Sequence, residues 1–405
     1  AVAMTGGQSL EGTMTVPRIT QQMYAEGAQR IVVVTDEPQK YAADTQFAPG
    51  VSVYHRDELD KVQRELREIE GTTILVYDQT CAAEKRRRRK RGTFPDPAKR
   101  VFINEAVCEG CGDCGEKSNC LAVVPLETEL GRKRAIDQSA CNKDFSCLKG
   151  FCPSFVTVLG GRPRRGKASA ADTVDANELT QVAVALPEPI RPALNRPYGI
   201  VVTGVGGTGV VTIGALLGMA AHLDGKGCSI LDQMGLAQKG GSVISHLRIA
   251  GTQRDITATR IAAGGADLVL GGDLLTTGAT DTLTTMASGR TRVVANVHEI
   301  MPGAFTRGAD IEFPGARIQR AIRSATGDGG AQFLNATRLA TALMGDAIAS
   351  NLFLLGYAYQ KGLLPVSGES LLQAIELNGV AIDMNKQAFT WGRHAGALQS
   401  AEAVV

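Results

Sequence analysis

The cysteine residues are distributed very unevenly along this chain of 405 residues. Nine occur in all, and seven of them lie between Cys108 and Cys152, while Cys81 and Cys228 stand alone. A secreted disulfide scaffold would be short and would carry its cysteines along its whole length. A dense group within a long chain that shows no signal peptide is more typical of metal binding, so we expect these cysteines to hold metal.

The spacing of the seven cysteines favours iron–sulfur clusters. They follow one another as Cys108-x2-Cys111-x2-Cys114-x5-Cys120 and Cys141-x5-Cys147-x4-Cys152-Pro153. Three thiolates two residues apart, with a distant cysteine before a proline, are typical of bacterial two-cluster ferredoxins. Structural zinc, which prefers pairs of ligands in two knuckles, is the alternative.

In two-cluster ferredoxins the last cysteine of each run ligates the other cluster. The first cluster is therefore predicted to be held by Cys108, Cys111, Cys114 and Cys152. The second receives Cys120, Cys141 and Cys147, and the residue at the position of its missing ligand is Asp144. We expect both clusters to be [4Fe–4S]. Because a carboxylate is a harder and weaker iron ligand than a thiolate, the second is expected to lose one iron easily and become [3Fe–4S]. The alternative for Asp144 is a solvated loop carboxylate.

Two other stretches of the chain show the pattern of an α/β protein. In the first, β-branched runs at 31–34 and 73–77 predict buried parallel strands, and a helical spacing predicts a helix within 57–68. Residues 161–196 are rich in proline and lack periodicity, which predicts a linker. From Tyr198 the predicted elements are strands at 199–203, 228–231, 269–270 and 293–295 and helices at 210–223 and 347–359.

A glycine-rich turn, Gly204-Val205-Gly206-Gly207-Thr208-Gly209, follows the first strand of the second stretch and opens a helix. This pattern is the fingerprint of dinucleotide-binding folds, and Asp232 follows the last glycine at a tolerable spacing. The alternative is a tight turn that packs the helix closely against the strand and binds no nucleotide.

The charge balance restricts the partners of the chain. The net charge of +2 argues against a general nucleic-acid binder. Lys85–Arg91 is a run of seven basic residues without interleaved aromatics, so base stacking is not predicted. We expect the run to be solvated or paired within the molecule, with docking of an acidic electron carrier, or nucleic-acid binding by a zinc protein, as alternatives. No apolar run is long enough for a membrane span, and the five histidines show no ligand spacing.

Three stretches resemble the long-chain indolepyruvate ferredoxin oxidoreductases of the 2-oxoacid:ferredoxin oxidoreductase family. Met4-Thr5-Gly6-Gly7-Gln8 is similar to the segment that follows the thiamine-diphosphate and magnesium motif. The cysteine segment, with residues 124–133 between its two runs, is similar to an inserted ferredoxin-like part. The sequence from Tyr198, with its glycine turn and residues 238–242, is similar to the gamma domain.

The resemblance implies an α/β fold of several parts. Residues 1–90 would be the C-terminal part of a thiamine-diphosphate-binding α/β domain, 91–160 a ferredoxin-like two-cluster segment, 161–196 a linker and 197–405 a Rossmann-like gamma domain. Because the metal-binding motif of the family would precede Ala1, we expect the chain to be a piece of a longer polypeptide. The cofactor-binding residues implied are Thr5, Gly6, Gly7, Gln8, Gly204, Gly206, Gly207 and Gly209.

The reaction implied by the resemblance is the oxidative decarboxylation of an aryl 2-oxoacid such as indolepyruvate. Electrons would pass through the clusters to ferredoxin, and coenzyme A would take the acyl group, with thiamine diphosphate and Mg bound in the full-length enzyme. The implied partners are a remaining N-terminal portion or companion subunit and a second copy of the chain, in a cytoplasmic protein that binds neither nucleic acid nor membrane. Gamma domains of this family are not known as nicotinamide sites, so the resemblance favours a turn that binds no NAD. The other hypothesis is a stand-alone electron-transfer or docking module without chemistry of its own.

Overall fold

The computed structural model describes residues 12, 14–90, 92–161, 186–234, 241–306, 308, 310–398 and 400–404. The predicted cofactor residues Thr5, Gly6, Gly7 and Gln8 lie outside these ranges. The chain forms two compact units. One consists of Ala1–Pro97 and Asn142–Asp144, and the other of Ala98–Cys141 and Phe145–Val405. Each unit is described by itself.

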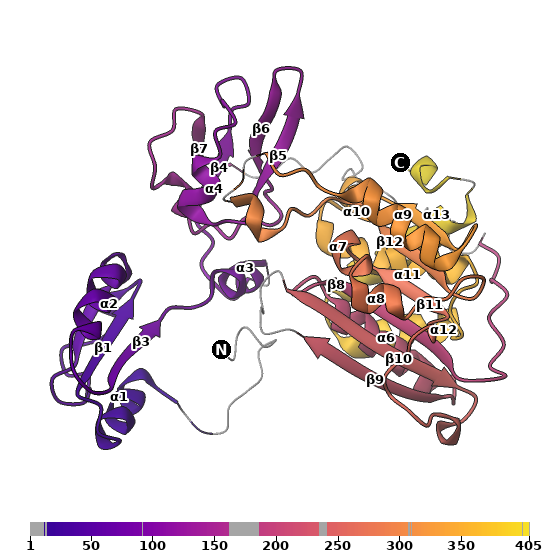
Figure 1. The fold of residues 1–405 in the computed structure, drawn as a ribbon, viewed down its shortest axis with the longest axis horizontal. Helices are drawn as coiled ribbons and strands as arrows, with labels where there is room; N and C mark the ends of the chain where they lie inside the picture. The colour runs from indigo at the N-terminus through magenta and orange to yellow at the C-terminus, as the bar shows by residue number, and fades with distance from the viewer. Residues whose placement is uncertain are drawn as a thin grey trace. The chain divides into compact units, whose positions relative to one another are not determined.

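The first unit contains a three-stranded parallel sheet in the order β2-β1-β3 (Figure 1). The continuous apolar run Ile31–Val34 fills the central strand and is buried on both faces, as the sequence predicts. The predicted helix within 57–68 is α2, which turns Val62 and Leu66 toward the sheet. The elements of this unit are α1 (Val16–Ala25), β1 (Arg30–Thr35), η1 (Pro38–Lys40), β2 (Ser52–His55), η2 (Arg56–Glu58), α2 (Leu59–Arg67), β3 (Thr73–Asp78) and α3 (Ala82–Lys90).

The cysteine segment forms the first part of the second unit. Two antiparallel strand pairs, β4 with β7 and β5 with β6, frame its loops. The chain reverses between β5 and β6 through a two-residue loop, and Gly131 begins β6 with a φ of 90° that suits glycine. The elements are β4 (Lys99–Ile103), α4 (Asp113–Ser118), β5 (Val123–Thr128), β6 (Gly131–Ile136), η3 (Ser146–Leu148) and β7 (Phe155–Leu159).

The rest of the second unit is built on a six-stranded sheet in the order β13-β12-β11-β8-β10-β9. The sheet strands are β8 (Tyr198–Val205), β9 (Gly227–Met234), β10 (Ser242–Ala250), β11 (Leu268–Gly271), β12 (Arg292–Asn296) and β13 (Ala331–Leu334). All the strands predicted from the sequence are present. Strand β10 was not predicted, and it lies antiparallel between β8 and β9.

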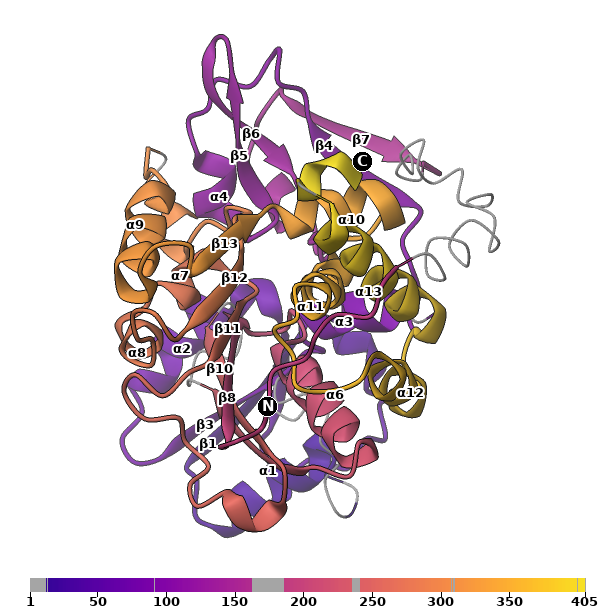
Figure 2. The ribbon, with the colours of Figure 1, turned by 90° about the vertical axis from the view of Figure 1, so that its right-hand side faces the viewer.

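Helices cover both faces of this sheet (Figure 2). Because side chains alternate along a strand, Ile200 and Val202 face one helical layer while Val201 faces the other. The first layer contains α6 (Val210–Leu223), α10 (Ala336–Met344), η7 (Ala347–Ala349), α11 (Ser350–Gln360), α12 (Gly368–Asn378), α13 (Ile382–Ala397) and η8 (Ala401–Val404). The second contains α7 (Leu274–Thr277), α8 (Thr280–Thr284) and α9 (Gly315–Thr326). Of two short turns, η5 (Gln253–Asp255) lies between β10 and β11, and η6 (Gly303–Thr306) lies between β12 and α9.

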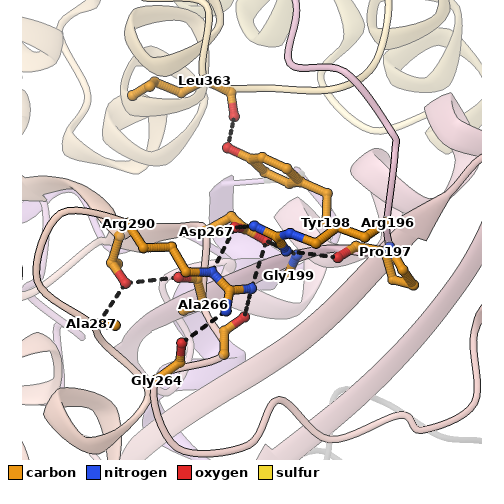
Figure 3. Close-up of polar contacts among 12 residues, drawn as sticks. Arg196, Pro197, Tyr198, Gly199, Gly264, Ala266, Asp267, Ala287, Arg290 and Leu363 are labelled. Carbon is orange, nitrogen blue, oxygen red and sulfur yellow. Dashed lines mark hydrogen bonds and ion pairs between the residues drawn. The ribbon is translucent and has the colours of Figure 1, made fainter.

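Asp267 organises the edge of the sheet where β8 and β11 begin (Figure 3). Its buried carboxylate accepts two hydrogen bonds from Arg196, at 2.5 and 3.0 Å, and one from the Arg290 Nε at 3.0 Å. It also accepts a hydrogen bond from the Gly199 amide, with 2.8 Å between the amide nitrogen and the Asp267 Oδ2. Charge-assisted hydrogen bonds from the two guanidinium groups therefore hold together the segments that lead into β8, β11 and β12.

Within the part of the chain that the structure describes, no helix combines the length and the apolar character needed to cross a bilayer.

Candidate functional site

The first cysteine run forms a group of neighbouring thiols at the start of α4. Burial, with smaller contributions from the nearby Cys108 and Cys111, raises the pKa of Cys114 to about 11, although the Gly115 amide and the charge of Arg134 act in the opposite direction. Cys108 is buried and Cys111 is exposed, so the group lies at the boundary between core and solvent. The structure therefore brings together the three thiols that the C-x2-C-x2-C spacing predicts.

A second group of thiols forms around Cys147 on η3. Burial again raises the pKa, here to about 11, followed by the effects of Cys120 and Cys141. Helix α4 packs against η3, and Cys114 also influences Cys147, which places the two groups side by side. Cys120 and Cys141, predicted to share the second cluster with Cys147, thus both lie close enough to act on the Cys147 thiol.

The loop that carries Cys108 and Cys111 packs tightly against β6. The Gly110 amide donates a hydrogen bond to the Cys108 Sγ at 3.4 Å. Gly110 has a φ of +75°, and a Cβ at this position would collide with the carbonyl oxygen of Arg132. Glycine is therefore required here both for the left-handed backbone and for the close approach of the two segments.

These observations fit a group held by thiolates. Seven cysteines in one segment, six of them arranged in two groups and one with an amide directed at its sulfur, are the donor set of iron–sulfur proteins. Thiols with raised pKa release protons when metal binds them. Among the described residues, no three His, Cys, Asp or Glu side chains are arranged to hold a single metal ion. Cys152 lies 3.0 Å from the Ser154 Oγ, and its place in the first cluster stays a prediction.

Asp144 belongs to the first unit together with Asn142. Its carboxylate accepts a hydrogen bond from Arg56 at 3.1 Å, and both side chains are partly exposed. In the same short segment, the Asn142 carbonyl accepts a bond from Arg89 at 2.7 Å. The role of Asp144 as an iron ligand stays a prediction, and Arg56 would have to share the carboxylate with iron.

The basic run lies on α3 and is engaged in pairs within the first unit. Lys85 forms an ion pair with Asp36 at 2.6 Å in which both side chains are largely buried. Glu84 pairs with Arg87 at 3.4 Å and with Arg88 at 3.1 Å. These contacts favour the prediction that the run pairs within the molecule; Arg91 lies outside the described residues.

The glycine turn has the predicted strand–turn–helix form, from β8 into α6. The Gly206 amide donates to the carbonyl of Gly241 at 2.8 Å, so it is not directed at a ligand. A Cβ at Gly204 would come within 2.7 Å of Val210, the first residue of α6. Gly204 therefore serves close packing between strand and helix.

The acidic residue of the dinucleotide fingerprint is displaced in this sheet. Asp232 lies on β9 opposite Ser245, and β10 separates β9 from β8. Adjacent strands are about 4.8 Å apart, so Asp232 is two strand spacings away from the strand that leads into the glycine turn. In dinucleotide-binding folds the acidic residue instead ends the strand next to that first strand.

Several polar residues near the carboxyl ends of the parallel strands were not predicted from the sequence. Asn296 ends β12, and its side-chain amide donates to the Thr337 Oγ1 at 2.8 Å. Asn351 on α11 donates to the Thr208 carbonyl at 2.8 Å and so braces the glycine turn. Asp273 follows β11, and one of its buried carboxylate oxygens has no hydrogen-bond partner among the described residues. In open α/β sheets, ligands bind at the edge formed by the carboxyl ends of the strands. A polar residue directly after an apolar strand could have predicted these positions from the sequence.

The comparisons with known proteins concern this second part of the chain. A model of the pyruvate ferredoxin/flavodoxin oxidoreductase family matches residues 199–395. Indolepyruvate oxidoreductase subunit IorB of Methanothermobacter thermautotrophicus is 30% identical over 202 residues, which are 49% of this chain and 98% of that subunit. The chain belongs to the 2-oxoacid:ferredoxin oxidoreductase family.

Other members of the 2-oxoacid:ferredoxin oxidoreductase family match the same half. IorB of Pyrococcus horikoshii is 29% identical over 199 residues, 49% of this chain and 95% of that subunit. Among solved structures, the pyruvate oxidoreductase subunit PORC of Thermotoga maritima covers 49% of this chain and 96% of its own, with 20% identity and a TM-score of 0.36. The predicted family is thus confirmed, through relatives that are named as subunits.

Proposed function

We propose that this chain provides the electron relay and the gamma domain of an enzyme that oxidatively decarboxylates aryl 2-oxoacids and reduces ferredoxin. The observation that carries the proposal is the pair of cysteine groups in the same compact unit as the family-matched domain. Bound there, iron–sulfur clusters would supply acceptors that take electrons one at a time. Cys108, Cys111, Cys114 and Cys152 would hold one, and Cys120, Cys141, Asp144 and Cys147 the other.

The cysteine segment would do three things for these clusters. The buried Cys108 and half-buried Cys114 keep water from one side of the first group. The Gly110 amide directs its proton at the Cys108 sulfur, which orients the ligand and favours a more negative charge on it. The exposed Cys111 leaves a side open for electron exchange with ferredoxin. Thiamine diphosphate and Mg would be held in the full-length enzyme.

The glycine turn is proposed to bind no NAD. Support comes from the occupied Gly206 amide and from the two-strand separation between β8 and Asp232. The amides of Gly207 and Gly209, which open α6, are proposed to meet a phosphate of coenzyme A instead. Calorimetry with NADH is expected to give no binding heat, and tight binding that Gly206→Val abolishes would contradict this proposal.

A reconstituted activity assay tests the proposed function. The chain alone, with iron–sulfur clusters restored, is expected to give no turnover of indolepyruvate with coenzyme A and ferredoxin. Addition of the complementary N-terminal portion or companion subunit should start ferredoxin reduction. Turnover by the chain alone contradicts the expectation, and no turnover of aryl 2-oxoacids with the complement contradicts the proposed reaction.

The second candidate is an electron-transfer or docking module without its own chemistry. One observation favours it. The relatives that match the C-terminal half of this chain are named as subunits, and the match covers 95 to 98% of their own length. In the same assay this candidate predicts cluster reduction by an external donor and electron passage to ferredoxin, with no dependence on 2-oxoacid even when the complement is present.

A further inference from the structure

Arg134 on β6 is a buried cation. Only 2% of the residue is exposed, although arginine is among the residue types that are almost never fully buried. Its guanidinium lies over the ring of Phe305 at 4.6 Å, and Phe305, on η6, is itself buried. The Arg134 Nη1 donates to the Lys133 carbonyl at 3.1 Å. A cation over an aromatic face is attracted by the ring, most strongly where water is excluded.

The guanidinium lies next to the elements that carry the first cysteine group. The Phe305 ring that it covers belongs to η6, and η6 contacts α4, the helix of Cys114. The backbone of β6 is in close contact with the loop that carries Cys108 and Cys111, because a Cβ on Gly110 would collide with the Arg132 carbonyl oxygen. Helix α4, which begins with Asp113 and Cys114, packs in turn against η6.

Arg132 lies on the same strand of the hairpin, and its side chain is only partly buried. Its Nη1 donates to the Ile311 carbonyl at 2.9 Å, and its Nε pairs with Glu127 at 2.5 Å. Arg132 and Arg134 are two residues apart on a strand and so lie on one face of the hairpin. Arg132 therefore attaches the hairpin to Ile311, and Arg134 places its charge over Phe305, on the turn that contacts the helix of Cys114.

We propose that Arg134 is a positioning residue of the electron path, a fixed positive charge that Phe305 holds beside Cys108, Cys111 and Cys114 and that raises the reduction potential of the cluster they bind. Reduction adds a negative charge, and a nearby buried cation stabilises it because the surroundings screen it poorly. The potential then depends on the packing of the β5–β6 hairpin against Phe305 and Ile311. The inference rests on the proposed function in that these cysteines bind an iron–sulfur cluster.

Redox titration of the full chain, reconstituted anaerobically with iron and sulfide and followed by electron paramagnetic resonance, tests this inference. In Arg134→Met the reduced-to-oxidised ratio of the first cluster at a fixed solution potential should fall roughly tenfold, which is about 59 mV for one electron. Arg134→Lys keeps the charge and should restore most of the ratio. Phe305→Leu keeps the arginine but removes the ring that holds it, and should give an intermediate shift.

Arg132→Met is the matched control, because it removes an arginine of the same hairpin and its bond to Ile311 while the charge beside Cys114 remains. Its first-cluster potential should stay that of the unmodified chain. Equal shifts in Arg132→Met and Arg134→Met, or an unchanged potential in Arg134→Met, would overturn the inference. If Arg134→Met does not fold, the potential of Phe305→Leu decides in the same way. A chain that takes up no cluster in its unmodified form refutes the proposed function itself, which is a separate outcome.

Discussion

Single residues decide how the two cysteine groups differ. The first is predicted to hold its cluster with four thiolates, whereas the second has Asp144 where the third cysteine of a C-x2-C-x2-C run would stand. In the structure this carboxylate accepts a hydrogen bond from Arg56 at 3.1 Å. A hard ligand that an arginine also attracts should hold iron less firmly than sulfur does.

Asp144→Cys is therefore expected to stabilise the second cluster. After mild oxidation with ferricyanide, the unmodified chain should show the paramagnetic signal of a three-iron cluster, and the variant should show little of it. Arg56→Met is the control, because it also removes the Arg56–Asp144 pair but adds no thiolate, and it should keep the three-iron signal. A signal that persists in Asp144→Cys would show that another residue completes the site.

Asp267 is a residue whose charge supports the fold rather than the chemistry. Burial alone would raise its pKa, but the hydrogen bonds from Arg196, Arg290 and the Gly199 amide outweigh burial and hold the pKa below its usual value. Because the pKa is lower in the folded state, this contribution to stability is present above the unfolded pKa of about 3.9. It is lost as the pH falls through the lower, folded value.

Asp267→Asn should cost about 2 kcal/mol at pH 7, less than for a fully buried pair, because both arginines are partly exposed. Urea unfolding at a series of pH values measures it. The difference from the unmodified chain should narrow below about pH 4. The exposed Asp328→Asn serves as the control and should change stability little; a gap at pH 7 that does not narrow in acid would contradict the account.

At the scale of elements, α11 and α13 cross with backbones in close contact. A Cβ on Gly356 would collide with the carbonyl oxygen of Phe389, and one on Gly392 would collide with that of Phe353. The crossing is thus reciprocal, with one glycine on each helix. It lies in the main core cluster beside the buried rings of Phe353 and Phe389.

Gly356→Ala should destabilise the second unit by about 3 kcal/mol, since overpacking a core forces backbone shifts. Thermal unfolding followed by circular dichroism measures the loss. Gly251→Ala is the matched control, because the nearest atom to its Cβ would be 3.9 Å away. If both variants unfold at the temperature of the unmodified chain, the helices do not cross as described.

The elements also show what the sequence could predict. Strands β1, β8, β11 and β12 are continuous apolar runs, and each was predicted because both of its faces are covered. Strand β10 was missed because serine, histidine and arginine interrupt its apolar residues. The sequence Arg132-Lys133-Arg134 does not indicate which of its two arginines is buried, because the residue type is the same. Only the register of β6 against β5, and the loop that packs on it, decides that.

At the scale of the whole molecule, the sequence predicted the family and the two cysteine groups from spacing and local motifs. It could not predict that residues 142–144 lie with the first unit while the cysteines on either side lie with the second. Nor could it predict the antiparallel strand that separates Asp232 from β8. Both depend on contacts between residues far apart in the chain, which local patterns do not encode.

The central claim is that the cysteine segment holds two iron–sulfur clusters. Anaerobic reconstitution with iron and sulfide, followed by metal and sulfide analysis and by spectra of the oxidised and dithionite-reduced chain, tests it most directly. The account predicts a brown protein with broad visible absorption, iron and sulfide for two clusters, and paramagnetic signals on reduction. A colourless chain that prefers zinc, with no signal after dithionite, would contradict it.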